Sequence, residues 1–347
     1  MGKFKFDVAI GNPPYQDEAV GDNKTFAPPI YNVFMDETFK VCNKVELIHP
    51  ARFLFNAGST PKQWNKKMLN NKHFKVIHYE GDASKVFSNT EIKGGVAITY
   101  FDADKDFGTI DTFTPYDELH SIMKKVVTRS DFKPFSSIVF PRSVCRLTEK
   151  LHEDFPTAES RISKGHKFDV SSNIFDILDD VFLDSIPQDG HEYLKILGRS
   201  ENQRVYKYIR NDYIRNTENL DKYKVFLPNV GGTGRLGEVL STPEIGAPNE
   251  ISTETFISIG AFVSEEEAKS VVKYVKGKFA RALLGILKVT HHNAPAVWEK
   301  VPLQNFSVSS DIDWTQPIAS IDRQLYRKYG LDENEISFIE KNVKEMD

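Results

Sequence analysis

Short apolar runs bounded by turn residues dominate the first third of the chain. Strands are expected where β-branched and aromatic residues cluster between such turns, at 6–10, 45–49, 74–79, 94–101 and 108–113. Apolar positions from Trp64 to Leu69 recur at helical spacing, which predicts a helix there. The turn 104–108 is predicted to join the last two strands as a hairpin. Strands alternating with helices predict an α/β fold for this region.

After about residue 125 the pattern changes to basic and proline-bearing segments. A strand is expected at Tyr223–Leu227, and Ser264 followed by Glu267 predicts a capping box that opens a helix. Near the end, the pattern predicts a helix at 318–329 ended by Gly330, and a second helix capped by Asp332. We therefore expect three regions, 1–125, 126–310 and 311–347.

Composition adds limits on the class of protein. The 347 residues are enough for at least two domains with ordinary cores. Two cysteines, Cys42 and Cys145, predict no disulfide framework and a reducing compartment. No apolar run reaches membrane-spanning length, so we expect a cytoplasmic protein with no membrane partner. The formal net charge of −4 is carried by the last 37 residues, with nine acidic and five basic side chains, and the rest is neutral.

The segment with the most specific chemistry is Asn12-Pro13-Pro14-Tyr15, directly after the first predicted strand. The carboxyl end of a strand in an open α/β sheet is where ligands bind. The Asn12 side-chain oxygen and the Pro13 carbonyl are two acceptors, and Pro14 restricts the loop. Tyr15 offers a ring on which a base can stack. These four residues can hold the two hydrogens of an exocyclic amine, such as N6 of an adenine extruded from DNA. A simple proline turn after a buried strand is the plainer alternative.

The motif resembles the (Asn/Asp/Ser)-Pro-Pro-(Tyr/Phe/Trp) motif of N6-adenine-specific DNA methyltransferases. Further stretches resemble later parts of restriction–modification methylases of the type IIG kind: 46–54, 76–87, 94–100, 278–281, 301–303 and 321–326. The resemblance implies the second half of a class I (Rossmann-like) methyltransferase sheet, followed by an α+β target-recognition domain and a C-terminal helical tail. It also implies that Asn12, Pro13, Pro14 and Tyr15 are catalytic, that the methyl donor is S-adenosylmethionine and that the partner is double-stranded DNA.

The chain departs from this family at the S-adenosylmethionine site. In most such enzymes that site is a glycine-rich turn upstream of the motif, and only five residues precede Phe6. The resemblance therefore implies a C-terminal part of a larger enzyme. Its cofactor site would lie largely in an N-terminal methyltransferase half or a partner subunit.

A glycine-rich segment within the chain is a weak alternative cofactor site. Gly232, Gly234 and Gly237 follow the predicted strand 223–227 with Gly-x-Gly-x-x-Gly spacing. The stretch that follows Gly237 is too short, and too rich in proline and glycine, to form the helix that such a site requires. A flexible glycine loop is the structural alternative.

Candidate DNA contacts lie in the second region. Tyrosines at 206, 208 and 213 alternate with cations that suit phosphate and base contacts, although an ordinary amphipathic strand fits the same pattern. The candidate cations are Arg204, Lys207, Arg210, Arg215, Lys278 and Arg281. The resemblance also implies an aromatic near the predicted hairpin that packs against the extruded base, and Phe107 is the candidate. A role in the core is the alternative for this phenylalanine.

Other chemistries have weaker support. Adjacent His291 and His292 have no further ligands at useful spacing, so no metal site is expected. Asp82 with Glu91 and Lys93 fits the loose pattern of Mg-dependent nucleases, but residues this common recur by chance. A non-catalytic DNA-binding specificity module and an endonuclease therefore remain as alternatives to the methyltransferase.

Overall fold

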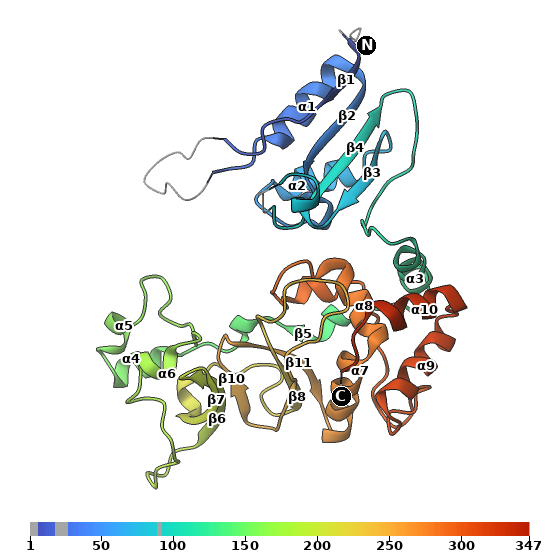
Figure 1. The fold of residues 1–347 in the computed structure, drawn as a ribbon. Helices are drawn as coiled ribbons and strands as arrows, with labels where there is room; N and C mark the ends of the chain where they lie inside the picture. The colour runs from blue at the N-terminus through green and yellow to red at the C-terminus, as the bar shows by residue number, and fades with distance from the viewer. Residues whose placement is uncertain (1–5, 18–26, 89–91, 347) are drawn as a thin grey trace. The chain divides into compact units, whose positions relative to one another are not determined.

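The structure is a computed structural model that describes residues 6–17, 27–88 and 92–346. The chain divides into two compact units, Met1–His120 and Ser121–Asp347, and helix α3 (Asp117–Val127) crosses the boundary (Figure 1). Segment 311–347, expected to be a separate tail, belongs to the second unit. Among the described residues, no helix has the length and apolar character needed to cross a bilayer.

The first unit is built on one sheet with the strand order β1-β2-β4-β3. Strand β1 runs parallel to β2, and the two other pairs are antiparallel. The strands are β1 (Phe6–Gly11), β2 (Cys42–Pro50), β3 (Phe74–Glu80) and β4 (Val96–Asp102), and the helices are α1 (Tyr31–Val41) and α2 (Lys62–Leu69), with the short 3₁₀ turns η1 (Arg52–Phe55) and η2 (Ala83–Lys85).

Alternation along β2 explains which face of this sheet is covered. Val45, Leu47 and His49 are buried, while the residues between them are only partly covered. The buried side chains pack with Met35 of α1 and Met68 of α2 in one hydrophobic core. Because successive side chains of a strand point to opposite faces, one face of the sheet carries this core.

Four of the five strands expected in the first unit are present, and so is the helix at 64–69. The expected strand 108–113 and its hairpin are wrong. Instead of pairing with β4, residues 107–111 bond back to the end of α2 and the turn that follows it. The backbone amides of Phe107 and Ile110 donate to the carbonyls of Lys72 and Leu69. Phe113 is anchored in the core against Phe55. Local sequence gives no sign of this long-range bonding.

The second unit contains two sheets, with the orders β10-β6-β7 and β5-β11-β8-β9. Its strands are β5 (Val139–Phe140), β6 (Tyr193–Ser200), β7 (Gln203–Arg210), β8 (Tyr223–Pro228), β9 (Glu244–Gly246), β10 (Glu250–Ser252) and β11 (Phe256–Phe262). Its helices after α3 are α4 (Glu149–Asp154), α5 (Ala158–Arg161), α6 (Ile174–Ile177), α7 (Glu265–Lys276), α8 (Lys278–Leu287), α9 (Ile318–Lys328) and α10 (Glu333–Asn342). Four 3₁₀ turns are η3 (Phe135–Ile138), η4 (Arg142–Val144), η5 (Asn211–Tyr213) and η6 (Pro295–Trp298). The observed mixture of helices and several sheets agrees with an α/β class.

The expected helix ends are largely confirmed. Asp332 and Glu335 form a complete capping box at α10. Ser264 caps α7 by accepting from the Glu267 amide, but the Glu267 carboxylate reaches back to the amide of Val263, one residue before the cap. Gly330 follows α9 with φ +63°, a conformation that favours glycine.

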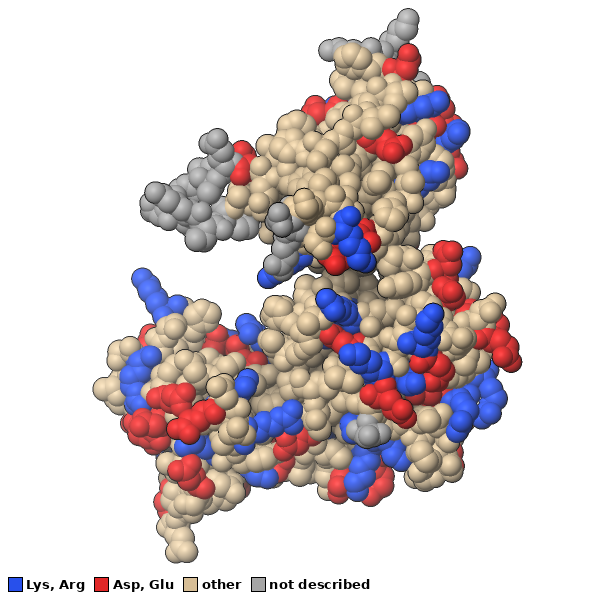
Figure 2. Space-filling model, viewed as in Figure 1, with Lys and Arg blue, Asp and Glu red and all other residues tan. Residues whose placement is uncertain are grey.

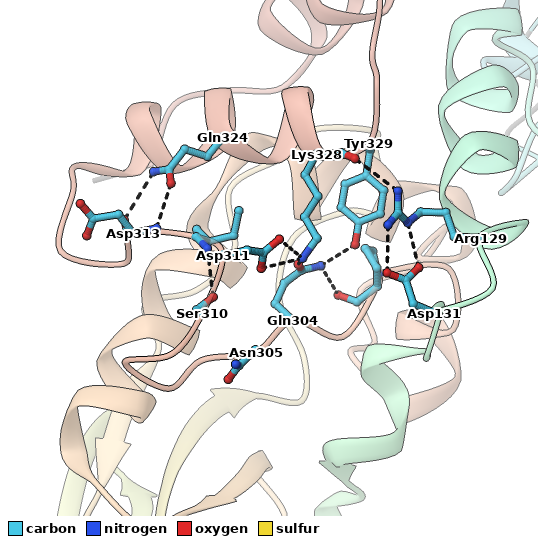
Figure 3. A network of polar contacts seen from close by, with 12 residues as sticks. Arg129, Asp131, Gln304, Asn305, Ser310, Asp311, Asp313, Gln324, Lys328 and Tyr329 are labelled. Carbon is cyan, nitrogen blue, oxygen red and sulfur yellow. Dashed lines mark hydrogen bonds and ion pairs between the residues drawn. The ribbon is translucent and has the colours of Figure 1, made fainter.

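A polar network attaches α9 to the rest of the second unit (Figure 3). Lys328 donates to Gln304 and pairs with Asp311, and the Gln304 amide donates to the Tyr329 hydroxyl. Arg129, paired with Asp131, also donates to the Lys328 carbonyl. Because these partners come from segments before and after the sheets, the C-terminal helices form part of this unit's structure.

Candidate active site

The Asn12–Tyr15 loop leaves the carboxyl end of β1 and is open to solvent. Asn12 and Pro14 are exposed, and Pro13 and Tyr15 are half-buried. The loop is fixed on its far side, because the Ile30 amide donates to the Tyr15 carbonyl at 3.2 Å and Asp17 donates to Pro28 at 2.9 Å. Two prolines and this anchored stem restrict the loop while leaving the Asn12 amide free to meet a ligand.

Tyr15 faces a second aromatic side chain at the site. Its ring meets Phe87 edge to face, with centroids 6.4 Å apart and planes at 67°. Burial raises the pKa of the Tyr15 phenol, and the neighbouring Asn12 side chain partly offsets that rise. Among the described residues, the buried Tyr15 hydroxyl has no hydrogen-bond partner, and the Asn12 side chain is its polar neighbour. Tyr15 is therefore a neutral aromatic at ordinary pH.

The structure does not bring Phe107 to this loop. Phe107 packs on Tyr100, with ring centroids 6.0 Å apart, and the Lys75 ammonium lies 4.7 Å from its centroid. It follows the carboxyl end of β4, which lies beside the amino end of β2 through the pair Lys44↔Asp102. Asn12 follows the opposite end of the sheet, so Phe87 is the aromatic placed to assist Tyr15. In the sequence, Phe87 follows shortly after the third predicted strand, at the end of the stretch 76–87 that resembles methylases of this kind.

Buried polar residues stiffen the sheet below the loop. His49 is fully buried, its Nε2 lies 2.7 Å from the Thr99 hydroxyl, and its ring stacks on Tyr31 at 5.7 Å. Burial lowers the pKa of His49 to about 4, so this imidazole is neutral near pH 7. Burial raises the pKa of Tyr31 to about 12. Both rings are neutral supports rather than acid–base groups.

Backbone amides of the glycine-rich segment already donate to a side chain of the same protein. Glu238 accepts from the backbone amides of Thr233 at 2.6 Å and Gly234 at 2.9 Å, and pairs with the buried Lys288 at 2.7 Å. Burial raises the pKa of Glu238, but the hydrogen bonds from these donors lower it by more, so the pKa lies below its usual value. A carboxylate thus fills the cradle that a cofactor phosphate or carboxylate would need.

The three glycines of this segment have packing reasons to be glycine. All three have positive φ. A Cβ on Gly232 would lie 2.3 Å from Glu238 Oε1, and one on Gly234 would lie 2.3 Å from the Thr290 amide. One on Gly237 would lie 2.1 Å from the Asn342 carbonyl. No helix follows directly, since the next regular element is β9. These contacts favour the structural alternative for the segment.

Most of the candidate DNA-binding cations are engaged within the protein. Arg204 pairs with Glu244 at 3.3 Å, Lys207 with Asp184 at 2.9 Å and Arg210 with Asp212 at 2.6 Å. Lys278 pairs with Glu340 at 2.5 Å, while Arg215 lies over the Phe168 ring. Arg281 is buried and donates to three backbone carbonyls. On the face shown in Figure 2, Lys and Arg atoms lie among Asp and Glu atoms over 121–347. A DNA role for these cations stays a prediction.

Metal chemistry has no site in the described ranges, where no cluster of three or more His, Cys, Asp or Glu side chains could hold an ion. The His291 and His292 rings lie 4.2 Å apart. Asp82 caps η2 by accepting from the Ser84 amide, and Glu91 lies outside the described residues. Cys42 and Cys145 are both free and buried, and burial raises the pKa of Cys145 to about 11.

Comparisons with known proteins bear on the first unit. Residues 1–87 match the family described as the Eco57I restriction-modification methylase. An uncharacterized adenine-specific methylase of Mycoplasma pneumoniae is 35% identical over 103 residues, which are 29% of this chain and 24% of that protein. The chain therefore spans about a quarter of this relative. The resemblance to adenine-specific and restriction–modification methylases is confirmed for the part of the chain that carries the Asn12–Tyr15 motif.

Two solved structures resemble the chain more weakly. The type IIG restriction endonuclease BpuSI has a TM-score of 0.35 and 10% identity, over 90% of this chain and 48% of that one. The type IIL restriction-modification enzyme MmeI, solved in complex with DNA, has a TM-score of 0.36 and 9% identity, over 97% of this chain and 56% of that one. Both scores are too low to support an argument about fold or function.

Proposed function

We propose that this chain carries the catalytic loop of an adenine-specific DNA methyltransferase of a restriction–modification system. The main support for this proposal is the open Asn12–Tyr15 loop at the carboxyl end of β1, which lies inside the segment that matches the methylase family. The reaction is methylation of N6 on an adenine extruded from double-stranded DNA. S-adenosylmethionine supplies an activated methyl group on sulfur, so no metal is required.

The loop acts on the nucleophile. The lone pair of the adenine amine is delocalised into the ring, which makes the nitrogen a poor nucleophile. The Asn12 side-chain oxygen and the Pro13 carbonyl accept the two amine hydrogens and favour a more tetrahedral nitrogen. Since the prolines and the Tyr15–Ile30 hydrogen bond restrain the backbone of the loop, little backbone ordering is needed on substrate binding.

Tyr15 and Phe87 hold the extruded base. A flipped base is commonly stacked between aromatic or apolar side chains, and these two rings lie together at the loop. The Tyr15 face supports the base, and Phe87 fixes the Tyr15 ring and extends the apolar wall. Phe87, rather than Phe107, is therefore the second aromatic residue proposed at this site.

S-adenosylmethionine is proposed to bind mainly outside the described residues. The glycine-rich segment 231–237 does not fit it, because Glu238 occupies its backbone amides. No step of the mechanism is therefore assigned to that segment.

The exposed edge of β1 supports a partner that completes the sheet. Among the described residues β1 pairs only with β2, and Phe6, Val8 and Ile10 are 60%, 54% and 77% exposed. Parallel strands normally occur in sheets covered on both faces, and each fully buried apolar side chain contributes about 1.5–3 kcal/mol. We propose that a methyltransferase half or a partner subunit, supplying the cofactor site, packs on this surface. The implied architecture is half of a Rossmann-like sheet followed by a target-recognition region.

A non-catalytic DNA-binding specificity module is the second candidate. It is favoured by the occupied glycine-rich segment, which leaves the described residues without a recognisable cofactor loop. Calorimetric titration of the chain with S-adenosylmethionine, alone and with the natural partner half, separates the two functions. Binding in the presence of that half supports the methyltransferase, and no binding in either case supports the module.

Asn12→Ala tests the assignment of the loop. In the natural protein that contains this chain, we expect transfer of labelled methyl groups to DNA to fall at least about 100-fold, as when one preorganised hydrogen-bonding group is removed. DNA affinity should change little, because Asn12 acts at the reacting amine. Asn70→Ala, at an exposed position after α2, is the matched control and should retain activity. Full activity of Asn12→Ala would refute the catalytic role.

A further inference from the structure

Arg52 lies at the same end of the sheet as the motif, and no counter-charge is found for it among the described residues. It opens η1, two residues after β2 ends at Pro50. Its side chain is half-buried. Within the described ranges, no carboxylate lies within ion-pair distance of its guanidinium and no hydrogen bond from it is formed, unlike the paired arginines of the second unit. A partly buried cation left unpaired is costly unless a ligand or solvent compensates it.

Two glycines leave room for the Arg52 side chain. Gly94 has φ +88°, and a Cβ there would lie 2.5 Å from Arg52 Cγ. Gly58 has φ +84°, and a Cβ there would lie 3.3 Å from Arg52 Cβ and 3.6 Å from Nε. Backbone from two separate loops thus packs along the stem of this arginine. The packing limits how the guanidinium can be placed and leaves its polar end to a ligand.

Contacts through the chain connect Arg52 to the catalytic loop. The Tyr15 carbonyl accepts from the Ile30 amide, and Tyr31 is the next residue. Tyr31 is close enough to Arg52 for the positive charge to lower the Tyr31 pKa, although burial raises that pKa by more. The Ala51 amide donates to the Gly95 carbonyl at 3.0 Å. Strand β2, which delivers Arg52, lies beside β1, which delivers Asn12, and both strands run in the same direction.

We propose that Arg52 binds a backbone phosphate of the DNA strand that bears the target adenine, an inference that rests on the proposed function. A guanidinium presents donors in a fork that matches two phosphate oxygens. An extruded nucleotide turns about its own backbone, so a phosphate contact at the sheet edge fixes where the base enters the loop. Arg52 is thus a DNA-contacting residue that positions the nucleotide and takes no part in the methyl transfer itself.

The salt dependence of DNA binding tests this contact. Each phosphate neutralised adds about 0.9 to the slope of log affinity against log salt concentration for duplex DNA. Binding of the 347-residue chain to a fluorescent duplex of mixed sequence is measured by anisotropy between about 50 and 200 mM salt. For Arg52→Gln and Arg52→Met, which keep a similar stem, we expect the slope to become shallower by about 0.9. Arg52→Lys, which keeps the charge but not the fork, should retain the slope with weaker affinity.

Lys105→Gln is the matched control. Lys105 is exposed and follows the carboxyl end of β4, at the opposite end of the same sheet, so its loss should leave the slope unchanged. Circular dichroism checks that each variant is folded. If Arg52→Gln does not fold, Arg52→Met is the neutral variant whose slope is compared with that of the wild type. An unchanged slope in folded neutral variants of a chain that binds DNA would overturn the Arg52 inference alone. No salt-dependent DNA binding by the wild-type chain would count against the proposed function, and the inference would fall with it.

Discussion

At the scale of single residues, the sequence located the loop but not its neighbours. Asn12-Pro13-Pro14-Tyr15 is contiguous, so its chemistry could be interpreted from local order. Phe87 lies 72 positions beyond Tyr15 and meets it only through folding. Arg204 looks like a free cation in the sequence, yet its partner Glu244 is 40 residues away. Clusters of like charge indicate where cations are but not which of them have acidic partners.

Phe87→Ala tests the aromatic pair. Phe87 holds the Tyr15 ring on which the base is proposed to stack. Such stacking is worth about 1–3 kcal/mol, so loss of Phe87 should reduce methylation of DNA, by at most about 150-fold. Phe107→Ala removes a ring of the same kind at the other end of the sheet and should leave the rate nearly unchanged. Steady-state methylation by the natural protein provides the measurement. A larger loss in the Phe107 variant than in the Phe87 variant would restore the assignment made from sequence.

At the scale of elements, strands β1 to β4 could be predicted because their apolar residues are dense and bounded by turn residues. The segment 108–113 has the same appearance and forms no strand, since Ile110 and Asp111 bond to the Leu69 carbonyl. The capped ends of α7 and α10 could be predicted, because a cap involves residues only three apart. Elements whose stabilising contacts are close together in the sequence could therefore be predicted, and the segment held by distant contacts could not.

The buried imidazole between β2 and β4 makes the first unit sensitive to acid. The pKa of His49 is about 4 in the folded state, below the usual 6.5, so the unfolded chain binds the proton first as pH falls. The contribution of neutral His49 to the free energy of unfolding is fully present above about pH 6.5. It is lost as pH falls toward about 4, and the loss is about 3 kcal/mol at most. Hydrogen-exchange protection of β2 and β4 at pH 7 and pH 4.5 measures this loss.

Two variants separate His49 from other acid-sensitive groups. His49→Gln should weaken protection at pH 7, because it disturbs the stack on Tyr31, but should reduce the further loss at pH 4.5. His78→Gln is the control, since His78 is exposed on β3 and its loss should leave the pH dependence as in the wild type. Equal pH dependence in the wild type and His49→Gln would show that another group is responsible.

At the scale of the whole molecule, the net charge of −4 does not exclude the proposed action on DNA. Much of its positive charge in the second unit is matched by acids within ion-pair distance, so net charge says little about individual phosphate contacts. The first unit combines the open Asn12–Tyr15 loop, the exposed apolar strand β1 and Arg52, which has no ion-pair partner among the described residues. These features fit a surface that meets both DNA and a further protein segment.

The product formed on DNA tests the central claim most directly. DNA treated with S-adenosylmethionine and the natural protein that contains this chain is digested to nucleosides and analysed by mass spectrometry. The account predicts N6-methyl-2′-deoxyadenosine with the wild-type protein and its loss with Asn12→Ala. Methylation of cytosine instead, or equal N6-methyladenine from the Asn12→Ala protein, would contradict it.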